Sequence, residues 1–196
     1  MRLLALLLMT CLALGAQEER RRAATTTAAA GGSPCATEQQ AEGDTGNFDG
    51  AQDWTGFRWK ANSFTTGGSG FTVCKAQAYL AKQGTPAAGT LEALIYTDSS
   101  GTPGTLVGTG SATLDRTTIS GTQAFVEFTG MSAVLSASTT YWFILKASAL
   151  DTDSGNRIYW QEDVTGETNT GKDSADGSAW ESPQTTRAWL FKLFSN

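Results

Sequence analysis

The chain has 196 residues with 22 glycines, a charged fraction of 17% and a net charge of −5, a composition that favours one domain of short strands and many turns over long helices. It has no histidine, which excludes a Ser-His-Asp triad, a Cys-His pair and a His-ligated zinc or copper site. Basic residues become sparse after Arg22, so we expect no nucleic-acid partner.

Residues 1–16 have the order of a secretory signal peptide. Met1 and Arg2 form a short basic start, residues 3–14 are an apolar run, and small residues follow at Gly15 and Ala16. The apolar run is short for a bilayer span, so we expect no membrane span in the mature form. We expect an exported protein that is extracellular or held at the cell surface.

Removal of the signal peptide also removes Cys11 and leaves Cys35 and Cys74. An even number of cysteines in an oxidising compartment favours a disulfide between them. Such a bridge closes a loop of about 40 residues and contributes about 3–4 kcal/mol in the chain-entropy model. The alternative is a buried free thiol at Cys74 and an exposed one at Cys35.

Residues 17–46 are predicted to be a low-complexity, disordered linker that acts as a flexible stalk. This stretch contains no large apolar side chain, so it cannot bury enough surface to offset its ordering entropy. The alternative is a strand donated to a neighbouring subunit, although alternating large apolar residues are missing.

Residues 47–196 are predicted to form an all-β domain, a jelly-roll-like antiparallel β-sandwich. Short apolar-rich runs alternate with turn clusters such as residues 98–104 and 151–156. Residues 139–147 carry apolar side chains on both faces, so we expect this strand to be central. We expect about seven to nine strands, including residues 70–81, 90–97, 106–114, 123–128, 139–147, 157–161 and 187–194.

Several short segments of this domain follow one another in a characteristic order and spacing. They are residues 61–68 (ANSFTTGG), 89–98 (GTLEALIYTD), 101–106 (GTPGTL) and 135–142 (LSASTTYW). In order and spacing they resemble the choice-of-anchor R domain, a bacterial and phage extracellular module, over residues 55–194. The resemblance implies a jelly-roll-like sandwich displayed outside the cell, with no catalytic residue set to carry over.

Three aromatic residues are candidates for ligand binding. Trp160 lies beside Tyr159 in a polar strand, and Trp180 lies in a predicted loop. Each could stack on the apolar face of a sugar ring. The alternative is that these rings cover the open end of the sandwich. Trp142 and Trp189 lie in strong strand patterns, so we expect both in the core.

The acidic residues suggest a metal site only weakly. Asp151 and Asp153, followed by Glu162, have part of the spacing of a calcium loop, but Gly155 and Asn156 do not fit an EF-hand. A looser structural Ca²⁺ site is one interpretation, and a turn held by side-chain hydrogen bonds is the other. We expect no other cofactor.

Carboxylate pairs are the remaining candidates for catalysis. Glu162 with Asp163, Asp151 with Asp153, or Asp173 with Asp176 could serve a glycosidase, but no spacing singles out one pair, and acidic loop residues are mostly solvated turn formers. We therefore expect no catalytic residues and a secreted, non-catalytic surface, adhesion or assembly module. The alternatives are a carbohydrate-binding module and a structural subunit of an extracellular filament or phage particle. The expected partners are a glycan, a surface protein or further copies of the chain.

Overall fold

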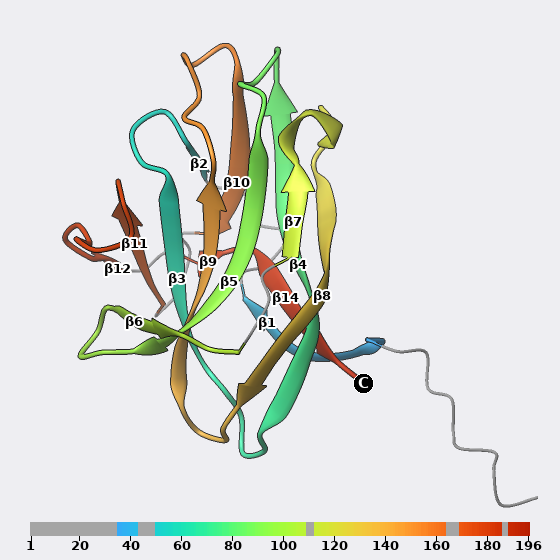
Figure 1. The fold of residues 1–196 in the computed structure, drawn as a ribbon, viewed down its shortest axis with the longest axis vertical. Coiled ribbons are helices and arrows are strands. Elements are labelled where there is room, and N and C mark those ends of the chain that lie inside the picture. Colours follow the sequence, from blue (N-terminus) through green and yellow to red (C-terminus); the bar gives the residue numbers. More distant parts are fainter. Residues whose placement is uncertain (1–34, 43–49, 109–111, 164–168, 186–187) are drawn as a thin grey trace, which may run out of the picture. The chain divides into compact units, whose positions relative to one another are not determined.

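The computed structural model describes residues 35–42, 50–108, 112–163, 169–185 and 188–196. In this part of the chain, two antiparallel sheets pack face to face as a sandwich (Figure 1). Strands β3 to β5, and again β8 to β11, alternate between the two sheets along the chain, which is the connectivity expected of a jelly roll. The predicted jelly-roll-like antiparallel β-sandwich is confirmed. The predicted signal peptide lies outside the described residues.

Sheet A has the strand order β1-β14-β4-β10-β13, with β2 paired to β10 and β8 paired to β4. Its strands are Thr37–Glu42 (β1), Gly50–Asp53 (β2), Phe71–Gln83 (β4), Ala124–Leu135 (β8), Arg157–Asp163 (β10), Ala188–Trp189 (β13) and Phe191–Ser195 (β14). Sheet B has the order β12-β11-β3-β9-β5-β6, with β7 paired to β5. Its strands are Trp59–Thr65 (β3), Thr90–Asp98 (β5), Pro103–Leu106 (β6), Ala112–Asp115 (β7), Thr140–Ala147 (β9), Thr170–Ser174 (β11) and Gln184–Thr185 (β12).

Strand β9 is central in sheet B, as predicted. It pairs with β3 on one side and with β5 on the other, and the run from Tyr141 to Leu145 is buried. Alternation along the strand places Phe143 in the main core between the sheets and Trp142 in a second cluster on the outer face of sheet B. Both faces of β9 are therefore covered.

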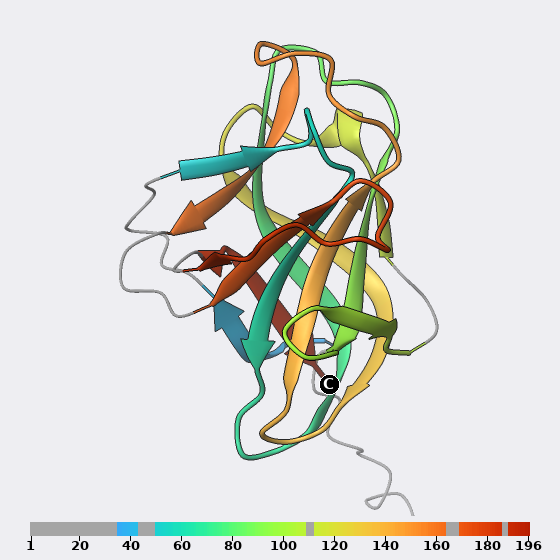
Figure 2. The ribbon, with the colours of Figure 1, turned by 90° about the vertical axis from the view of Figure 1, so that its left-hand side faces the viewer.

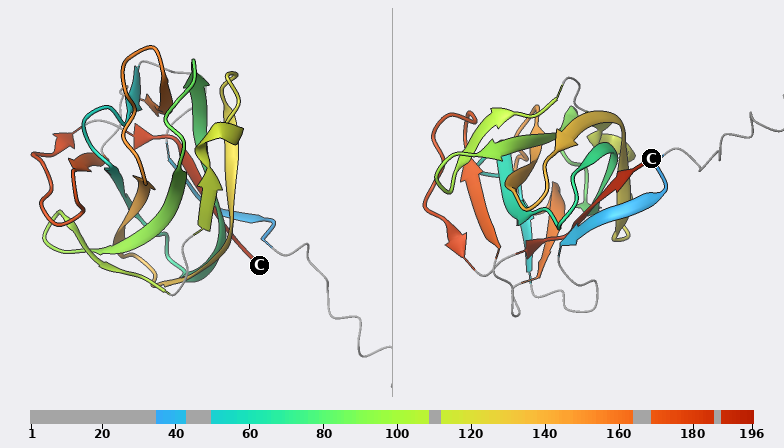
Figure 3. Two further views of the ribbon diagram at one scale, coloured as in Figure 1. Left: turned by 45° about the horizontal axis from the view of Figure 1, so that its top comes forward. Right: turned by 90° about the horizontal axis from the view of Figure 1, so that it is seen from below.

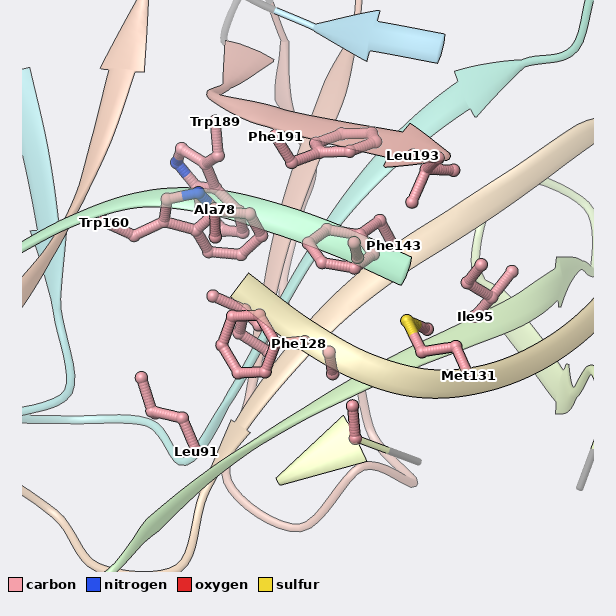
Figure 4. Packing of buried hydrophobic residues seen from close by; sticks show 14 of the residues in the cluster. Ala78, Leu91, Ile95, Phe128, Met131, Phe143, Trp160, Trp189, Phe191 and Leu193 are labelled. Atoms are coloured by element: carbon pink, nitrogen blue, oxygen red, sulfur yellow. The ribbon is translucent and has the colours of Figure 1, made fainter. Parts of the chain in front are cut away.

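The main core joins the two sheets through aromatic rings (Figure 4). Phe143 of sheet B stacks on Phe191 of sheet A with ring centroids 4.6 Å apart. Trp160 lies 5.7 Å from Phe143 and 5.0 Å from Trp189, measured between ring centroids. Aromatic pairs of this kind each contribute about 0.5–1.5 kcal/mol beyond their buried area.

Part of the predicted stalk is a strand of the sandwich. Strand β1 pairs with β14 (Figure 3), and Cys35, just before β1, forms the predicted disulfide with Cys74 in β4. The sandwich thus begins earlier than the predicted boundary at residue 46, and β1 pairs within its own chain. Its sequence, TEQQAE, is polar and mostly exposed, so backbone pairing and the disulfide hold it, and apolar periodicity gives no sign of it.

Candidate functional site

Three aromatic side chains meet on the outer face of sheet B. Trp59 comes from β3, Tyr96 from β5 and Trp180 from the connection between β11 and β12. The ring centroid of Trp59 lies 6.4 Å from that of Tyr96 and 6.5 Å from that of Trp180, both in edge-to-face geometry. Each ring is partly exposed. We call Trp59, Tyr96 and Trp180 the aromatic patch.

A small apolar cluster beneath the patch fixes its position. Ala61, Leu94, Trp142 and Ile144 project from β3, β5 and β9 on the outer face of sheet B and are buried. Trp142 Nε1 also donates a hydrogen bond to Asp98 Oδ1 at 2.8 Å. Figure 2 shows the β11–β12 connection and the β5–β6 hairpin in front of β3 and β9. These two segments lie over the outer face of sheet B, where the cluster is.

The connection that carries Trp180 is held by its own hydrogen bonds. Ser174 Oγ accepts from the backbone N–H of Gly177 at 2.9 Å and donates to the carbonyl of Ala179 at 2.5 Å. Asp176 Oδ1 accepts from the backbone N–H of Ser178 at 2.8 Å, and this bond lowers the pKa of Asp176. The loop is thus ordered before any ligand arrives, which limits the entropy cost of binding.

Gly177 allows this loop to approach the patch closely. Its φ is +82°, and a Cβ at this position would lie 2.8 Å from Cε2 of Trp59. Any larger residue would push the loop away from the indole. The backbone at residue 177 therefore packs directly against Trp59.

One ion pair borders the patch. Lys146 Nζ lies 3.0 Å from Glu92 Oε2 and 4.9 Å from the ring centroid of Trp59, which is cation–π geometry. The pKa of Tyr96 is raised, chiefly by partial burial, while the charge of Lys146 acts in the opposite direction. The Tyr96 hydroxyl therefore stays protonated to a higher pH than that of an ordinary tyrosine, and at neutral pH it can donate a hydrogen bond.

The prediction that Trp160 binds a ligand is wrong. Its side chain is fully buried, and its Nε1 donates to the carbonyl of Leu190 at 2.9 Å. It packs against Phe143 and Trp189 between the two sheets (Figure 4). Trp160 therefore belongs to the main core between the sheets. Trp189 is in the same cluster and Trp142 is in the second one, so both are buried as predicted.

Tyr159 is partly exposed but does not share a site with Trp180. It alternates with the buried Ile158 and Trp160 along β10, so it lies on the outer face of sheet A. Its ring is covered by the guanidinium of Arg157, 4.3 Å from the ring centroid, and its hydroxyl bonds to Gln83. The aromatic patch lies on the outer face of the other sheet.

The two aspartates proposed as calcium ligands have different structural roles. Asp151 is buried, where it pairs with Arg116 and accepts from the backbone N–H of Ile158 at 3.0 Å. Asp153 is exposed and accepts from the N–H of Gly155 at 2.6 Å within a turn. The turn interpretation therefore describes Asp153, and the interpretation of Asp151 as a calcium ligand is wrong. Within the described ranges no group of three or more Cys, Asp or Glu side chains could hold a metal ion.

The acidic pairs considered for catalysis have structural contacts. Asp173 is buried beside Lys60, whereas Asp176 belongs to the exposed loop that holds Trp180. Glu162 and Asp163 are both buried, and Glu162 Oε2 accepts from Trp189 Nε1 at 3.2 Å.

Searches with protein-family models and among curated proteins found no match. The resemblance to the choice-of-anchor R domain therefore remains a hypothesis. In the described part of the chain, no helix is long and apolar enough to cross a membrane.

Sequence reasoning found Trp180 but missed its partners in the patch. Tyr96 alternates with the core residue Ile95, so its outward position was visible in the sequence. Trp59 precedes the run that resembles a family signature, and nothing in its neighbourhood marks it as exposed. Trp59 and Trp180 are far apart in the sequence, and only the fold brings their rings into contact.

Proposed function

We propose that this protein is an exported, non-catalytic adhesion module that presents the aromatic patch as a binding surface. The observation that carries the proposal is the meeting of Trp59, Tyr96 and Trp180 on a preordered outer face. The Cys35–Cys74 disulfide suits an oxidising compartment and agrees with the export pattern of residues 1–16. Asp53 and Asp151 each pair with an arginine, which is typical of structural carboxylates.

Export is tested with the full chain in a host that has a secretion pathway. We expect the protein outside the cytoplasmic membrane, with its N-terminus shortened near residue 16 and with the disulfide formed. Protein that stays in the cytoplasm with residues 1–16 attached would contradict the proposal.

Glycan binding is the more specific function that the patch favours. A partly exposed indole can stack on the C–H face of a sugar ring, and the Lys146–Glu92 pair offers a donor and an acceptor beside it. Sites that bind sugars combine aromatic surface with a few fixed polar groups. The hydroxyl of Tyr96 adds a third polar group at the edge of the patch.

A glycan array followed by titration tests this function. We expect Trp180→Ala to weaken binding of any glycan found by about tenfold or more, as for other anchoring aromatics. Tyr159→Ala is the matched control, because it removes a partly exposed ring from the opposite outer face and should leave affinity unchanged. No binding at millimolar glycan, or equal losses in both variants, would reject the patch as a glycan site.

Assembly into a filament or particle is the alternative function, and the oligomeric state distinguishes it from ligand binding. Size-exclusion chromatography of the exported protein should give a monomer if the patch acts on a foreign ligand. Stable multimers that persist in Trp180→Ala would instead favour the structural-subunit hypothesis.

A further inference from the structure

A lysine and an aspartate face each other inside the sandwich. Lys60 on β3 and Asp173 on β11 are register partners in sheet B, and Lys60 Nζ lies 3.1 Å from Asp173 Oδ1. The two side chains are only 2% and 7% exposed. At this separation the amine nitrogen is in ion-pair contact with a carboxylate oxygen, so it is held next to the carboxyl carbon Cγ, and the interior around both groups is dry.

The surroundings of the pair come from both sheets. Lys60 Nζ lies 6.0 Å from the ring centroid of Trp54 and 5.6 Å from that of Trp189, so two buried indoles shield it from water. Gln184 Nε2 donates to Asp173 Oδ2 at 3.3 Å. On the opposite sheet, Glu162 lies two residues after the inward-facing Trp160 in β10 and so shares its face, and its Oε2 accepts from Trp189 Nε1 at 3.2 Å. A second carboxyl group therefore projects into the interior beside the same indole.

We propose that Lys60 and Asp173 become joined by an intramolecular amide (isopeptide) bond once the protein has folded. One proton passes from the Lys60 ammonium to the Asp173 carboxylate, which leaves a neutral amine and a neutral acid. The Nζ lone pair then attacks Cγ of Asp173 and forms a tetrahedral intermediate. A second proton moves from Nζ to the hydroxyl group on Cγ, the C–O bond breaks, and one water leaves. The Nζ–Cγ amide replaces the two charges.

The neighbouring groups have defined parts in this step. Gln184 stabilises the negative charge that develops on Asp173 Oδ2 in the intermediate. Glu162 is the proton carrier between Nζ and the departing hydroxyl. Neutral products are favoured in an apolar interior, because a buried ion pair is costly to desolvate. The indoles of Trp54 and Trp189 exclude the water that would reverse the reaction.

The bond would have a clear structural effect. It would link β3 to β11 across 113 residues of sequence and so fasten the strand that precedes the Trp180 loop. The proposal does not depend on what the aromatic patch binds, or on whether it binds a glycan at all.

Mass spectrometry of the purified full chain tests the bond. We expect the folded protein to be lighter than its unlinked chain by one water, after correction for the disulfide and the observed N-terminus. A tryptic digest should contain one cross-linked product that joins the peptides of Lys60 and Asp173. A chain of unlinked mass, with both peptides recovered separately after long incubation of the folded protein, would overturn the proposal.

Three variants separate the chemistry from folding. Lys60→Arg keeps a cation beside Asp173 without a comparable nucleophilic amine, so it should fold with the disulfide formed and stay unlinked. Glu162→Gln keeps an acceptor for Trp189 but cannot carry a proton, so linkage should slow at least tenfold. Glu162→Asp should restore part of the rate. Linkage of Glu162→Gln at the wild-type rate would overturn the role of Glu162, and the water-deficit mass in Lys60→Arg would overturn the assigned nucleophile.

Discussion

Arg116 and Asp151 form an ion pair in which both side chains are completely buried. The Nη1 group of Arg116 donates to the carbonyl of Ala149 at 2.6 Å, and Asp151 Oδ2 accepts from the N–H of Ile158 at 3.0 Å. The pair thereby connects the short 3₁₀ helix Arg116–Thr118 to the start of β10. Removing one partner should strongly destabilise the fold, because the other charge is then left buried without a counter-ion.

Replacing Asp151 tests this directly. We expect Asp151→Asn to lower the free energy of unfolding by about 3–5 kcal/mol, because Arg116 would remain charged without its counter-ion. The measurement is urea unfolding followed by tryptophan fluorescence. Asp153→Asn is the control, since this exposed residue keeps an acceptor for its turn and should change stability by less than about 0.5 kcal/mol. Similar losses in the two variants would contradict the importance of the buried pair.

The individual residues of the candidate site are only partly predictable from the sequence. Trp180 stood out because it lies alone between turn residues, and the structure places it on the surface. The sequence wrongly predicts an exposed Trp160 because its neighbours Gln161, Glu162 and Asp163 are polar, and polar neighbours normally mark an exposed strand. Here those neighbours are themselves buried. A strand whose polar residues are buried looks like an exposed strand in the sequence, and this is why Trp160 is predicted to be exposed.

At the scale of strands, β1 depends on covalent attachment more than on packing. Its contacts besides the backbone pairing with β14 include the salt bridge from Lys192 Nζ to Glu38 Oε2 at 2.8 Å, the bond from Gln39 Nε2 to Ser195 Oγ at 3.0 Å and a hydrogen bond from the Asn169 side chain to Glu42. Contacts that are exposed or only partly buried are individually weak. The disulfide to Cys74 in β4 therefore carries much of the attachment.

Removing the bridge should release this strand selectively. We expect Cys35→Ser with Cys74→Ser to lower the free energy of unfolding by about 3–4 kcal/mol. Hydrogen exchange should show amides of residues 37–42 losing protection, while those of β9 remain protected. The control is wild-type protein under the same conditions without reductant. Equal protection of β1 in the two proteins would show that pairing with β14 is sufficient.

Strands were predictable where apolar alternation was strong. Strands β4, β5 and β9 match their predicted ranges closely, because core-facing residues alternate along them. The predicted strand at 106–114 is two separate strands, β6 and β7. Strand β11, with the sequence TGKDS, has no large apolar residue, since its inward positions are Gly171 against Trp189 and Asp173 against Lys60. Its burial depends on partners that are distant in sequence.

Across the whole molecule, several carboxylates stabilise the fold only while they are ionised. Asp53 is partly buried, which raises its pKa, but hydrogen bonds from Thr55 and Arg157 outweigh this effect, so the pKa is lowered. Hydrogen bonds from Lys75 and Gln77 lower the pKa of Glu127. The Asp53–Arg157 pair joins β2 to β10, and the Glu127–Lys75 pair joins β8 to β4.

Stability should therefore decline in acid. A carboxyl group whose pKa is lower in the folded state stabilises that state above its ordinary pKa, and the contribution is lost as the pH falls through the folded value. We expect the urea midpoint to be nearly constant around neutral pH and to fall as these carboxylates protonate. The double variant Asp53→Asn with Glu127→Gln should show a smaller decline. The same slope in both proteins would assign the acid sensitivity to other groups.

The position of the disulfide also determines how this module would bear tension. Strands β1 and β14 are antiparallel neighbours, and the N–H of Cys35 donates to the Asn196 side chain at 3.0 Å. Pulling apart Cys35 and Asn196 would, through hydrogen bonds alone, unzip the two strands one bond at a time. The covalent bridge instead passes the load from Cys35 directly to β4, in the interior of sheet A. A tether leading away from residue 35 would thus pull on one of the best-anchored strands of the domain, and its edge strand would be spared.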